Sequence, residues 1–202
     1  MANRSYRLGK RAEASEETGR RIVEATHALH GERGVRATTM AEIAARAGVS
    51  VGSVYHHFPS YDDAIAACGE FSLQRSPLPD ETIFTGAGSQ RERIGRLAAA
   101  VFGFYEKLPG LELVRRDRDS HAPLRAFFDR EERRRIDLAA GAIGEAADHS
   151  STATVSALLD LSVYSSLKLA GFDSGAAAAR IAEIINAWLA ARARQHRTTS
   201  AR

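Results

Sequence analysis

Apolar residues recur at helical spacing along most of the chain. In the clearest stretch, residues 94–105, they fall three or four positions apart (Ile94, Leu97, Ala98, Val101, Phe102 and Tyr105), which places them on one face of a helix. No segment alternates apolar and polar residues over the length of a strand, and no Asn-Gly hairpin dipeptide occurs. The pattern therefore predicts an all-α protein.

Prolines, glycines and capping residues divide this pattern into about nine helices. The predicted helices cover residues 15–31, 39–47 and 50–58, a segment that begins after Ser60, a segment around 94–105, and residues 111–119, 123–147, 151–171 and 174–194.

The second and third predicted helices are joined by a very short connection. Thr39 and Glu42 form a capping box at the start of the second helix, Gly48 suits the left-handed turn after it, and Ser50 can cap the third. This arrangement indicates a helix-turn-helix over residues 39–58. The second helix of such a unit lies in the DNA major groove, with its first residues at the base edges.

The distribution of charge agrees with a DNA partner. The first 61 residues contain nine Lys and Arg and six Glu, and so hold the whole formal net charge of +3. Four of these basic residues, Arg4, Arg7, Lys10 and Arg11, lie in a segment, residues 1–14, that we interpret as a basic arm. Such an arm favours a polyanion and can enter the minor groove. The alternative is a solvated, disordered tail.

Residues 38–65, TTMAEIAARAGVSVGSVYHHFPSYDDAI, resemble the DNA-binding signature of TetR-family transcriptional regulators. The resemblance extends back to Gly31-Glu32-Arg33-Gly34 and covers about the first third of the chain. It implies a three-helix DNA-binding domain (residues 1–60) and a carboxy-terminal domain for ligand binding and dimerisation (residues 61–202). It also implies a homodimer that binds double-stranded DNA at an inverted-repeat operator and is released by an unknown small-molecule effector. Repression is the family default, although the sequence does not distinguish a repressor from an activator.

Candidate DNA contacts lie at the starts of the second to fourth helices. They are Arg36, Thr38, Thr39, Ser50, Val51, Gly52, Ser53, Tyr55, His56 and Tyr61. Hydroxyl, imidazole and backbone N–H groups at these positions can contact phosphates or bases. The family usually has a lysine where this chain has Tyr61. A helical interaction protein that has lost DNA binding is therefore the second hypothesis.

The carboxy-terminal part offers candidates for an effector pocket and a dimer interface. Apolar pocket walls are expected from Phe102, Tyr105, Phe127, Phe128 and Tyr164, with His121 and Glu131 as polar anchors; the alternative for the aromatic residues is plain core. The run Arg130–Arg135 is expected to be a solvated face, unless Glu131 and Arg135 line a pocket or a helix contact. The predicted dimer interface comprises Val155, Leu159, Val163, Ile181, Ile185 and Trp188, unless these helices pack wholly inside the subunit.

Other function classes find little support in the sequence. Residues 48–52 match G-x-S-x-G, the serine nucleophile motif of hydrolases, but that motif needs a preceding strand, and a helix is predicted there. The pairs His56-His57 and His27/His30 lack further metal ligands, so no metal and no cofactor is predicted. A single cysteine, Cys68, excludes a disulfide framework. No secretory signal and no apolar run long enough to span a membrane occurs, so a cytoplasmic protein without membrane contact is expected.

Overall fold

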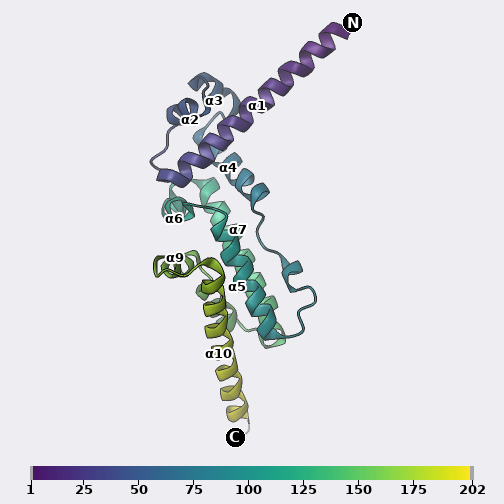
Figure 1. The fold of residues 1–202 in the computed structure, drawn as a ribbon, viewed down its shortest axis with the longest axis vertical. Coiled ribbons are helices and arrows are strands. Elements are labelled where there is room, and N and C mark those ends of the chain that lie inside the picture. Colours follow the sequence, from purple (N-terminus) through teal and green to yellow (C-terminus); the bar gives the residue numbers. More distant parts are fainter. Residues whose placement is uncertain (1, 201–202) are drawn as a thin grey trace. The chain divides into compact units, whose positions relative to one another are not determined.

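The computed structural model describes residues 2–200, with the side chains of residue 10 and residues 12–195. Within these residues all regular structure is helical, which confirms the predicted all-α class (Figure 1). The α-helices are α1 (Ala2–Arg33), α2 (Met40–Ala47), α3 (Val51–His57), α4 (Tyr61–Arg75), α5 (Gln90–Glu106), α6 (Leu111–Arg116), α7 (Ala122–Ile143), α8 (His149–Leu158), α9 (Leu161–Leu169) and α10 (Ser174–Ser200). Short 3-10 helices are η1 (Glu81–Phe84), η2 (Arg118–Ser120) and η3 (Gly144–Ala146).

None of the helices in the described part of the chain combines the length and the apolarity that a membrane crossing requires.

The chain forms two compact units. The head unit comprises Met1–Arg75 and Leu113–Phe128, and the body unit comprises Ser76–Glu112 and Asp129–Arg202. The first turns of α7 therefore belong to the head unit and the rest of that helix to the body unit. The division of function at residue 60 remains a prediction.

The head unit is built around a core to which α1, α2, α3 and α4 all contribute. Ile22 and Leu29 of α1 pack with Ile43 of α2 and Val54 of α3, and these side chains are essentially inaccessible to solvent. The small residue Ala44 is buried between the helices, which permits the close approach of α2. This core fixes α2 and α3 against the longer α1.

The body unit is held together mainly by the packing of α10 on α5. Leu97 and Phe102 of α5 are fully buried, as are Leu159, which follows α8, and Ile185 of α10. The apolar stripe that the sequence shows at residues 94–105 is thus the face that α5 turns toward the body core.

The first helix and the helix predicted over residues 151–171 differ most from the sequence prediction, and the last helix runs on to Ser200. The first helix begins at Ala2 rather than near residue 15, so the segment predicted as a basic arm is helical; the side chains of Arg4, Arg7 and Arg11 lie outside the described residues. The helix predicted over residues 151–171 is two helices, because Asp160 interrupts it. Its carboxylate accepts a hydrogen bond from the Ser162 backbone N–H (3.0 Å) and so caps α9.

Gly34 provides a test of the head unit, because no other residue fits its position. Its φ is +88°, and a Cβ there would lie 2.8 Å from Oδ2 of Asp117. We expect Gly34→Ala to lower the free energy of unfolding by about 1–3 kcal/mol. As a control, Gly103→Ala inside α5, where a Cβ meets nothing within 4 Å, is expected to leave stability unchanged or to raise it by up to about 1 kcal/mol. Urea denaturation of both variants measures the difference, and equal stabilities would contradict this description of the turn.

Candidate nucleic-acid interface

The short helix α3 is positioned by its buried side and by its first residue. Val54 is fully buried in the head core, and the neighbouring residues Val49 and Phe58 pack against the same core. At the start of the helix, the Ser50 hydroxyl accepts a hydrogen bond from the Ser53 backbone N–H (3.0 Å). Core packing and capping together fix both the tilt and the rotation of α3.

The turn between α2 and α3 depends on Gly48 and on Arg21. Gly48 has φ +66° and ψ +41°, the left-handed conformation that glycine adopts without strain. The guanidinium of Arg21 in α1 donates to the carbonyl oxygens of Ala47 and Gly48, the latter at 3.2 Å. A positive group at the carboxy-terminal end of α2 also stabilises its helix dipole. Sequence reasoning missed this role of Arg21, since nothing in the sequence relates it to Gly48.

The opposite side of α3 faces solvent. Val51 is 41% exposed and Tyr55 50% exposed, unusually large values for apolar and aromatic side chains in a small folded unit. Gly52 and His56 are also exposed, and Ser53 is half-buried. The exposed side of α3 thus carries the isopropyl group of Val51, the phenol of Tyr55 and the imidazole of His56. These groups can contact thymine methyl groups and hydrogen-bonding base edges.

Two of the predicted DNA contacts at the start of α2 are accessible to solvent. Thr39 caps α2 in the expected capping box with Glu42 and is exposed, as is Arg36. Thr38 is different, because only 4% of it is accessible and its hydroxyl donates to the Gly34 carbonyl (2.9 Å). The Thr38 hydroxyl is therefore engaged within the head unit, and a DNA contact of this residue stays a prediction.

Tyr61 also turns inward. Its hydroxyl donates to the Val35 carbonyl (2.7 Å) and lies 3.0 Å from Nε2 of His30, and its burial raises the pKa of the phenol. Because the single hydroxyl proton goes to Val35, His30 must donate from Nε2 to the tyrosine oxygen. The Tyr61 hydroxyl is thus engaged with His30 of α1 and with Val35, and its phosphate contact stays a prediction.

Residues 113–128 complete the head unit through two further polar contacts. Oδ2 of Asp117 accepts a hydrogen bond from the Arg36 backbone N–H (2.9 Å), and Nδ1 of His121 lies 2.6 Å from Oδ1 of Asp62. Asp117 is buried and His121 is half-buried. Sequence reasoning missed Asp117, whose partner is 81 positions away, and it placed His121 in the effector pocket instead.

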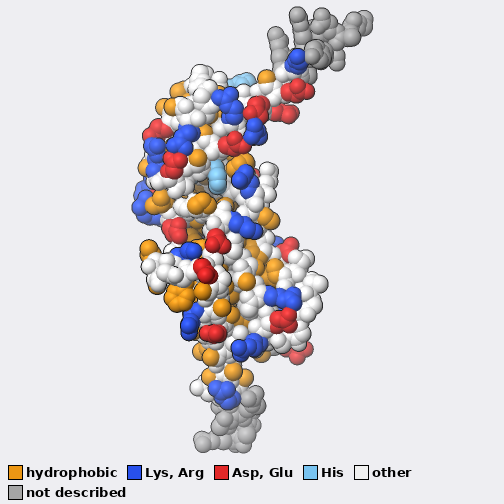
Figure 2. All heavy atoms as spheres, viewed as in Figure 1, with side chains coloured by type: hydrophobic (Ala, Val, Ile, Leu, Met, Phe, Trp, Pro, Cys, Tyr) orange, Lys and Arg blue, Asp and Glu red, His pale blue; other side chains and the backbone are white. Residues whose placement is uncertain are grey.

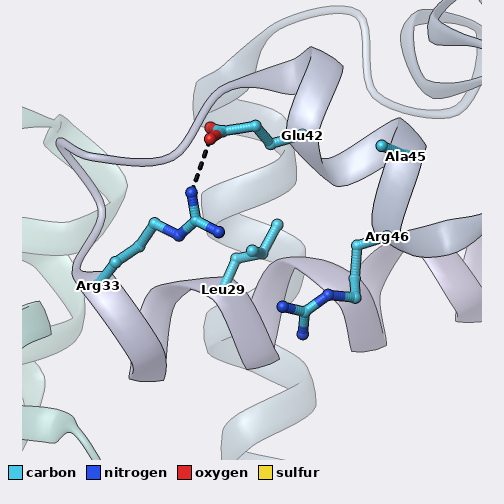
Figure 3. A pocket seen from close by; sticks show the side chains of 5 residues that line it. All are labelled: Leu29, Arg33, Glu42, Ala45 and Arg46. Atoms are coloured by element: carbon cyan, nitrogen blue, oxygen red, sulfur yellow. Dashed lines mark hydrogen bonds and ion pairs between the residues drawn. The ribbon is translucent and has the colours of Figure 1, made fainter.

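Several arginines of the head are paired with glutamates. Arg33 of α1 lies 2.6 Å from Glu42 of α2 and Arg46 of α2 lies 2.7 Å from Glu32, and Arg20 is paired within α1. Figure 3 shows Arg33 reaching toward Glu42 across a surface hollow lined by Leu29, Arg33, Glu42, Ala45 and Arg46. Acidic and basic side chains are interspersed on the face drawn in Figure 2. The charges of these arginines are therefore balanced locally, and the net excess of +3 is carried by the other basic residues of the first 61.

The predicted effector residues fall into the two units. In the body unit, Phe102, Tyr105 and Tyr164 form a buried aromatic cluster with ring centroids 5.2–6.4 Å apart. Phe127 and Phe128 are buried in the head unit, where a Cβ on Gly69 would lie 3.6 Å from the Phe127 ring. The aromatic residues are core in this structure, as the alternative interpretation has it.

Glu131 and Arg135 form a buried ionic cluster in the body unit. Oε1 of Glu131 accepts hydrogen bonds from the Tyr105 hydroxyl (2.7 Å) and from Nε of Arg135 (3.1 Å). The guanidinium also donates to the Ser156 carbonyl and, at 3.2 Å, to Oδ2 of Asp160. Burial and the adjacent Glu131 carboxylate raise the pKa of Tyr105, which therefore remains a proton donor. The expectation that this charged run is a solvated face is wrong for these two residues.

The predicted dimer residues are also largely internal. Val155, Leu159, Ile181 and Ile185 are buried within the body unit, where α10 packs on α5, whereas Val163 and Trp188 are half-buried. The exposed apolar side chains of this region are Leu169, 90% exposed, and Ile184, 46% exposed. Helical spacing therefore identified buried positions here, but it did not show whether they are buried inside the subunit or at an interface between subunits.

The serine of the G-x-S-x-G string does not have the geometry of a hydrolase nucleophile. Ser50 follows the helix α2 and caps the helix α3, whereas a nucleophile elbow requires a preceding strand. Within the described residues, no three His, Cys, Asp or Glu side chains gather as a metal site would require. His27 instead contacts Ser72 (3.2 Å) and His30 contacts Tyr61.

The amino-terminal part of the chain is similar to known regulators. Residues 22–68 match the family model described as bacterial regulatory proteins, tetR family. The HTH-type transcriptional repressor KstR2 of Mycobacterium tuberculosis is 46% identical over 44 residues, 22% of each chain. KstR2 of Rhodococcus jostii is 42% identical over 55 residues, 26% of this chain and 27% of the relative. The matches to these relatives span about a quarter of their length, and the residues that match the family model contain α2 and α3.

Solved structures share the fold over most of the chain. A putative TetR-family transcriptional regulator from Rhodococcus sp. has a TM-score of 0.65 and 20% identity, covering 85% of this chain and 98% of that protein. FadR from Bacillus subtilis, solved in complex with stearoyl-CoA, has a TM-score of 0.63 and 19% identity over 82% and 96%. These structures show that the chain shares their all-α fold. Residues 22–68, which contain α2 and α3, are thus similar to bacterial regulatory proteins of the tetR family.

His30 makes the stability of the head unit depend on pH. It is buried, and burial together with the nearby His27 and His121 lowers its pKa from 6.5 to about 4. The folded protein thus binds a proton less readily than the unfolded chain. The stabilisation is complete above about pH 6.5 and is lost as the pH falls toward 4, by up to about 3 kcal/mol.

We expect His30→Gln, whose amide can still donate to Tyr61, to flatten the decline in unfolding free energy between pH 6.5 and 4. Chemical denaturation at a series of pH values measures the slope. His56→Gln, at an exposed histidine, is the matched control and should leave the slope as in the natural protein. An unchanged slope in His30→Gln would show that other groups cause the decline.

Proposed function

We propose that this protein is a homodimeric transcriptional repressor that recognises an inverted-repeat operator in double-stranded DNA with α3 and acts in the cytoplasm. The observation that carries the proposal is the accessible face of α3. Val51 and Tyr55 are exposed on a helix whose opposite side, at Val54, is locked into the core. A rigid helix with apolar and hydrogen-bonding side chains on its free side has the properties that major-groove recognition requires.

Phosphate contacts in this proposal come from residues at the starts of α2 and α3. Arg36 and Thr39 are exposed before and at the start of α2, and Ser50 and Ser53 begin α3. Phosphate contacts fix the register of a protein on DNA, while base contacts select the sequence. Because Tyr61 and Thr38 are engaged inside the head, neither belongs to this set. The names of the KstR2 relatives, which are repressors, support repression as the mode of action.

Dimerisation in this proposal uses the apolar side chains that the body unit leaves accessible. Ile184 and the half-buried Trp188 lie one turn apart on α10, and Leu169 ends α9. Burial of large apolar and aromatic side chains at the centre of an interface is the usual source of binding free energy. A two-fold axis would set two α3 helices about one duplex turn apart, which is the reason for expecting an inverted repeat.

Release by a small-molecule effector is the last part of the proposal. Two solved structures with this fold were obtained with small molecules, FadR with stearoyl-CoA and the multidrug binding protein EbrR with imidazole. The body unit is where we place the effector, because the side chains predicted to line a pocket there, Tyr105 and Glu131, belong to a buried polar cluster. An effector shifts the DNA-binding equilibrium only if it binds the two states with different affinity.

Selection from a random duplex library at near-physiological salt tests DNA recognition. We expect an inverted repeat to be enriched and then bound far more tightly than a scrambled duplex. Salt matters because non-specific binding to phosphates weakens steeply as salt rises. Weak, salt-sensitive binding without any enriched sequence would instead favour the helical interaction protein that has lost DNA binding.

The enriched duplex then tests the role of α3. Tyr55→Ala is expected to weaken binding by about 10- to 100-fold, since one good base contact contributes about 1–3 kcal/mol. Because the side chain is half exposed, the unfolding free energy should hardly change. Ile136→Ala, at another exposed large side chain (39%) in the body unit, is the control and should bind as the natural protein does. Equal affinity of Tyr55→Ala would remove α3 from the interface.

Sedimentation velocity tests the dimer. We expect the natural protein to sediment as a dimer and Ile184→Asp as a folded monomer, because the substitution places a charge in the proposed apolar contact. Ile136→Asp makes the same chemical change at an exposed isoleucine outside that contact and should remain dimeric. A natural protein that is monomeric, or an Ile184→Asp variant that still dimerises, would contradict the proposed interface.

A further inference from the structure

The peptide group that joins Val35 to Arg36 is held at both of its polar atoms. The Tyr61 hydroxyl, at the start of α4, donates to the Val35 carbonyl oxygen (2.7 Å), and the Arg36 backbone N–H donates to Oδ2 of Asp117 (2.9 Å). This peptide is trans, so its carbonyl and its N–H point in opposite directions within one plane. Two side chains therefore hold the peptide from opposite sides, and we call this arrangement the 35–36 clamp.

The backbone around the 35–36 clamp is buried, whereas the Arg36 side chain is not. Gly34, Val35 and Thr38 are buried, and Arg36 is exposed. The Thr38 backbone N–H donates to the Val35 carbonyl (3.1 Å), and the Thr38 hydroxyl donates to the Gly34 carbonyl (2.9 Å). The peptide plane before Arg36 is thus fixed, and a hydrogen-bonded turn follows it. The direction in which the Arg36 side chain leaves the backbone is consequently fixed as well.

The positive charge of Arg36 is available to a partner. Among the arginines between residues 12 and 61, Arg21 donates to backbone carbonyls and three others pair with glutamates, namely Arg20, Arg33 and Arg46. No side chain in the described part of the protein forms a hydrogen bond or an ion pair with the Arg36 guanidinium. A guanidinium binds a phosphate through two parallel N–H groups. An arginine whose backbone is already fixed also loses less conformational freedom on binding.

Neither side chain of the clamp needs to touch DNA to affect this arginine. Tyr61 is half-buried, and Asp117 is 5% exposed. A backbone group that loses its partner away from water costs about 1–3 kcal/mol, so removal of either side chain favours another orientation of the peptide. The larger effect is expected at Asp117, because the Val35 carbonyl keeps the Thr38 N–H as a second donor.

We propose that Asp117 and Tyr61 are positioning residues for DNA binding, which act through the 35–36 clamp by holding the Arg36 side chain within reach of a backbone phosphate. The inference rests on the function proposed above, and it adds the residues that set one of the phosphate contacts. Asp117 and Tyr61 themselves stay inside the head unit while DNA is bound.

The salt dependence of binding to the enriched duplex tests the inference. Each phosphate contact contributes about 0.9 to the slope of log K against log salt concentration, so Arg36→Gln, which removes one contact in each subunit of a dimer, should make the slope shallower by about two. Asp117→Leu, which has a similar shape but no acceptor, should make it shallower by at least about one. A variant that merely lowers the folded fraction binds more weakly at every salt concentration and keeps its slope.

Two further variants control for shape and charge. Asp117→Asn retains a carbonyl acceptor for the Arg36 N–H and should keep the slope of the natural protein. Asp119→Leu makes the same chemical change as Asp117→Leu at an exposed aspartate two positions further on, and it should also keep the slope. A slope in Asp117→Asn as shallow as that of Asp117→Leu would contradict the clamp.

A double variant shows whether Asp117 acts through Arg36. Arg36→Gln combined with Asp117→Leu should have the slope of Arg36→Gln alone, because both changes remove the same contact. A still shallower slope would show that Asp117 acts on other phosphate contacts, and would overturn the inference. An unchanged slope in Arg36→Gln, or in a folded Asp117→Leu variant, would overturn it too.

If Asp117→Leu fails to fold, Tyr61→Phe decides instead. It removes the donor to the Val35 carbonyl and keeps the ring, and it should make the slope shallower by about one; an unchanged slope would overturn the inference. A natural protein that binds no duplex would contradict the function proposed above and the inference with it. Binding by the natural protein, with the same slope in the clamp variants, would contradict the inference alone.

Discussion

The seven-residue helix α3 cannot hold a conformation by itself. Isolated helices shorter than about 12–15 residues are marginal in water, so both the existence and the orientation of α3 depend on the rest of the head unit. Val54 supplies the attachment to the core, Ser50 supplies the amino-terminal cap, and Gly48 supplies the turn that brings α2 to it. Everything proposed about recognition follows from this constraint, because a helix fixed by one face presents the other face in a defined orientation.

Polar contacts around that core hold the helix ends and the connecting segments of the head unit in place. Arg21 holds the end of α2, Tyr61 ties α4 to the end of α1, and Asp117 binds the Arg36 backbone N–H. Tyr61 and Asp117 are at least partly withdrawn from water and each finds a partner, as buried polar groups must. The segment that leads into α2 is consequently fixed by side chains from two separate parts of the chain, Tyr61 and Asp117, while Arg21 fixes the end of α2.

Sequence reasoning succeeded where the signal is local. The capping box at Thr39, the glycine at position 48 and the cap at Ser50 each depend on residues a few positions apart, and the structure has all three. It failed where the partner is remote. The sequence around Tyr61 gives no indication that its hydroxyl donates to Val35, and a run of charges around Arg135 gives no sign of Ser156 and Asp160. Asp160 was also the residue that divided a predicted helix in two, because it caps α9 while it binds Arg135.

Apolar periodicity had a related limit. It marked Ile181 and Ile185 as buried, which they are, but burial inside the body unit and burial in a dimer give the same pattern. Only the accessible surface separates the two, and it points to Ile184 and Leu169. The charge excess of the first third does not say which basic residues are available: Arg33 and Arg46 are paired with glutamates. The outer face of α3, rather than net charge, therefore carries the case for DNA recognition.

Hydrogen–deuterium exchange of the protein with and without its selected duplex tests the central claim most directly. If the accessible side of α3 reads DNA, the specific duplex should slow amide exchange in residues 50–57 and at the start of α2 more than elsewhere, and a scrambled duplex at the same salt should not. Protection confined to the body unit, or equal protection by both duplexes, would contradict recognition of sequence by α3.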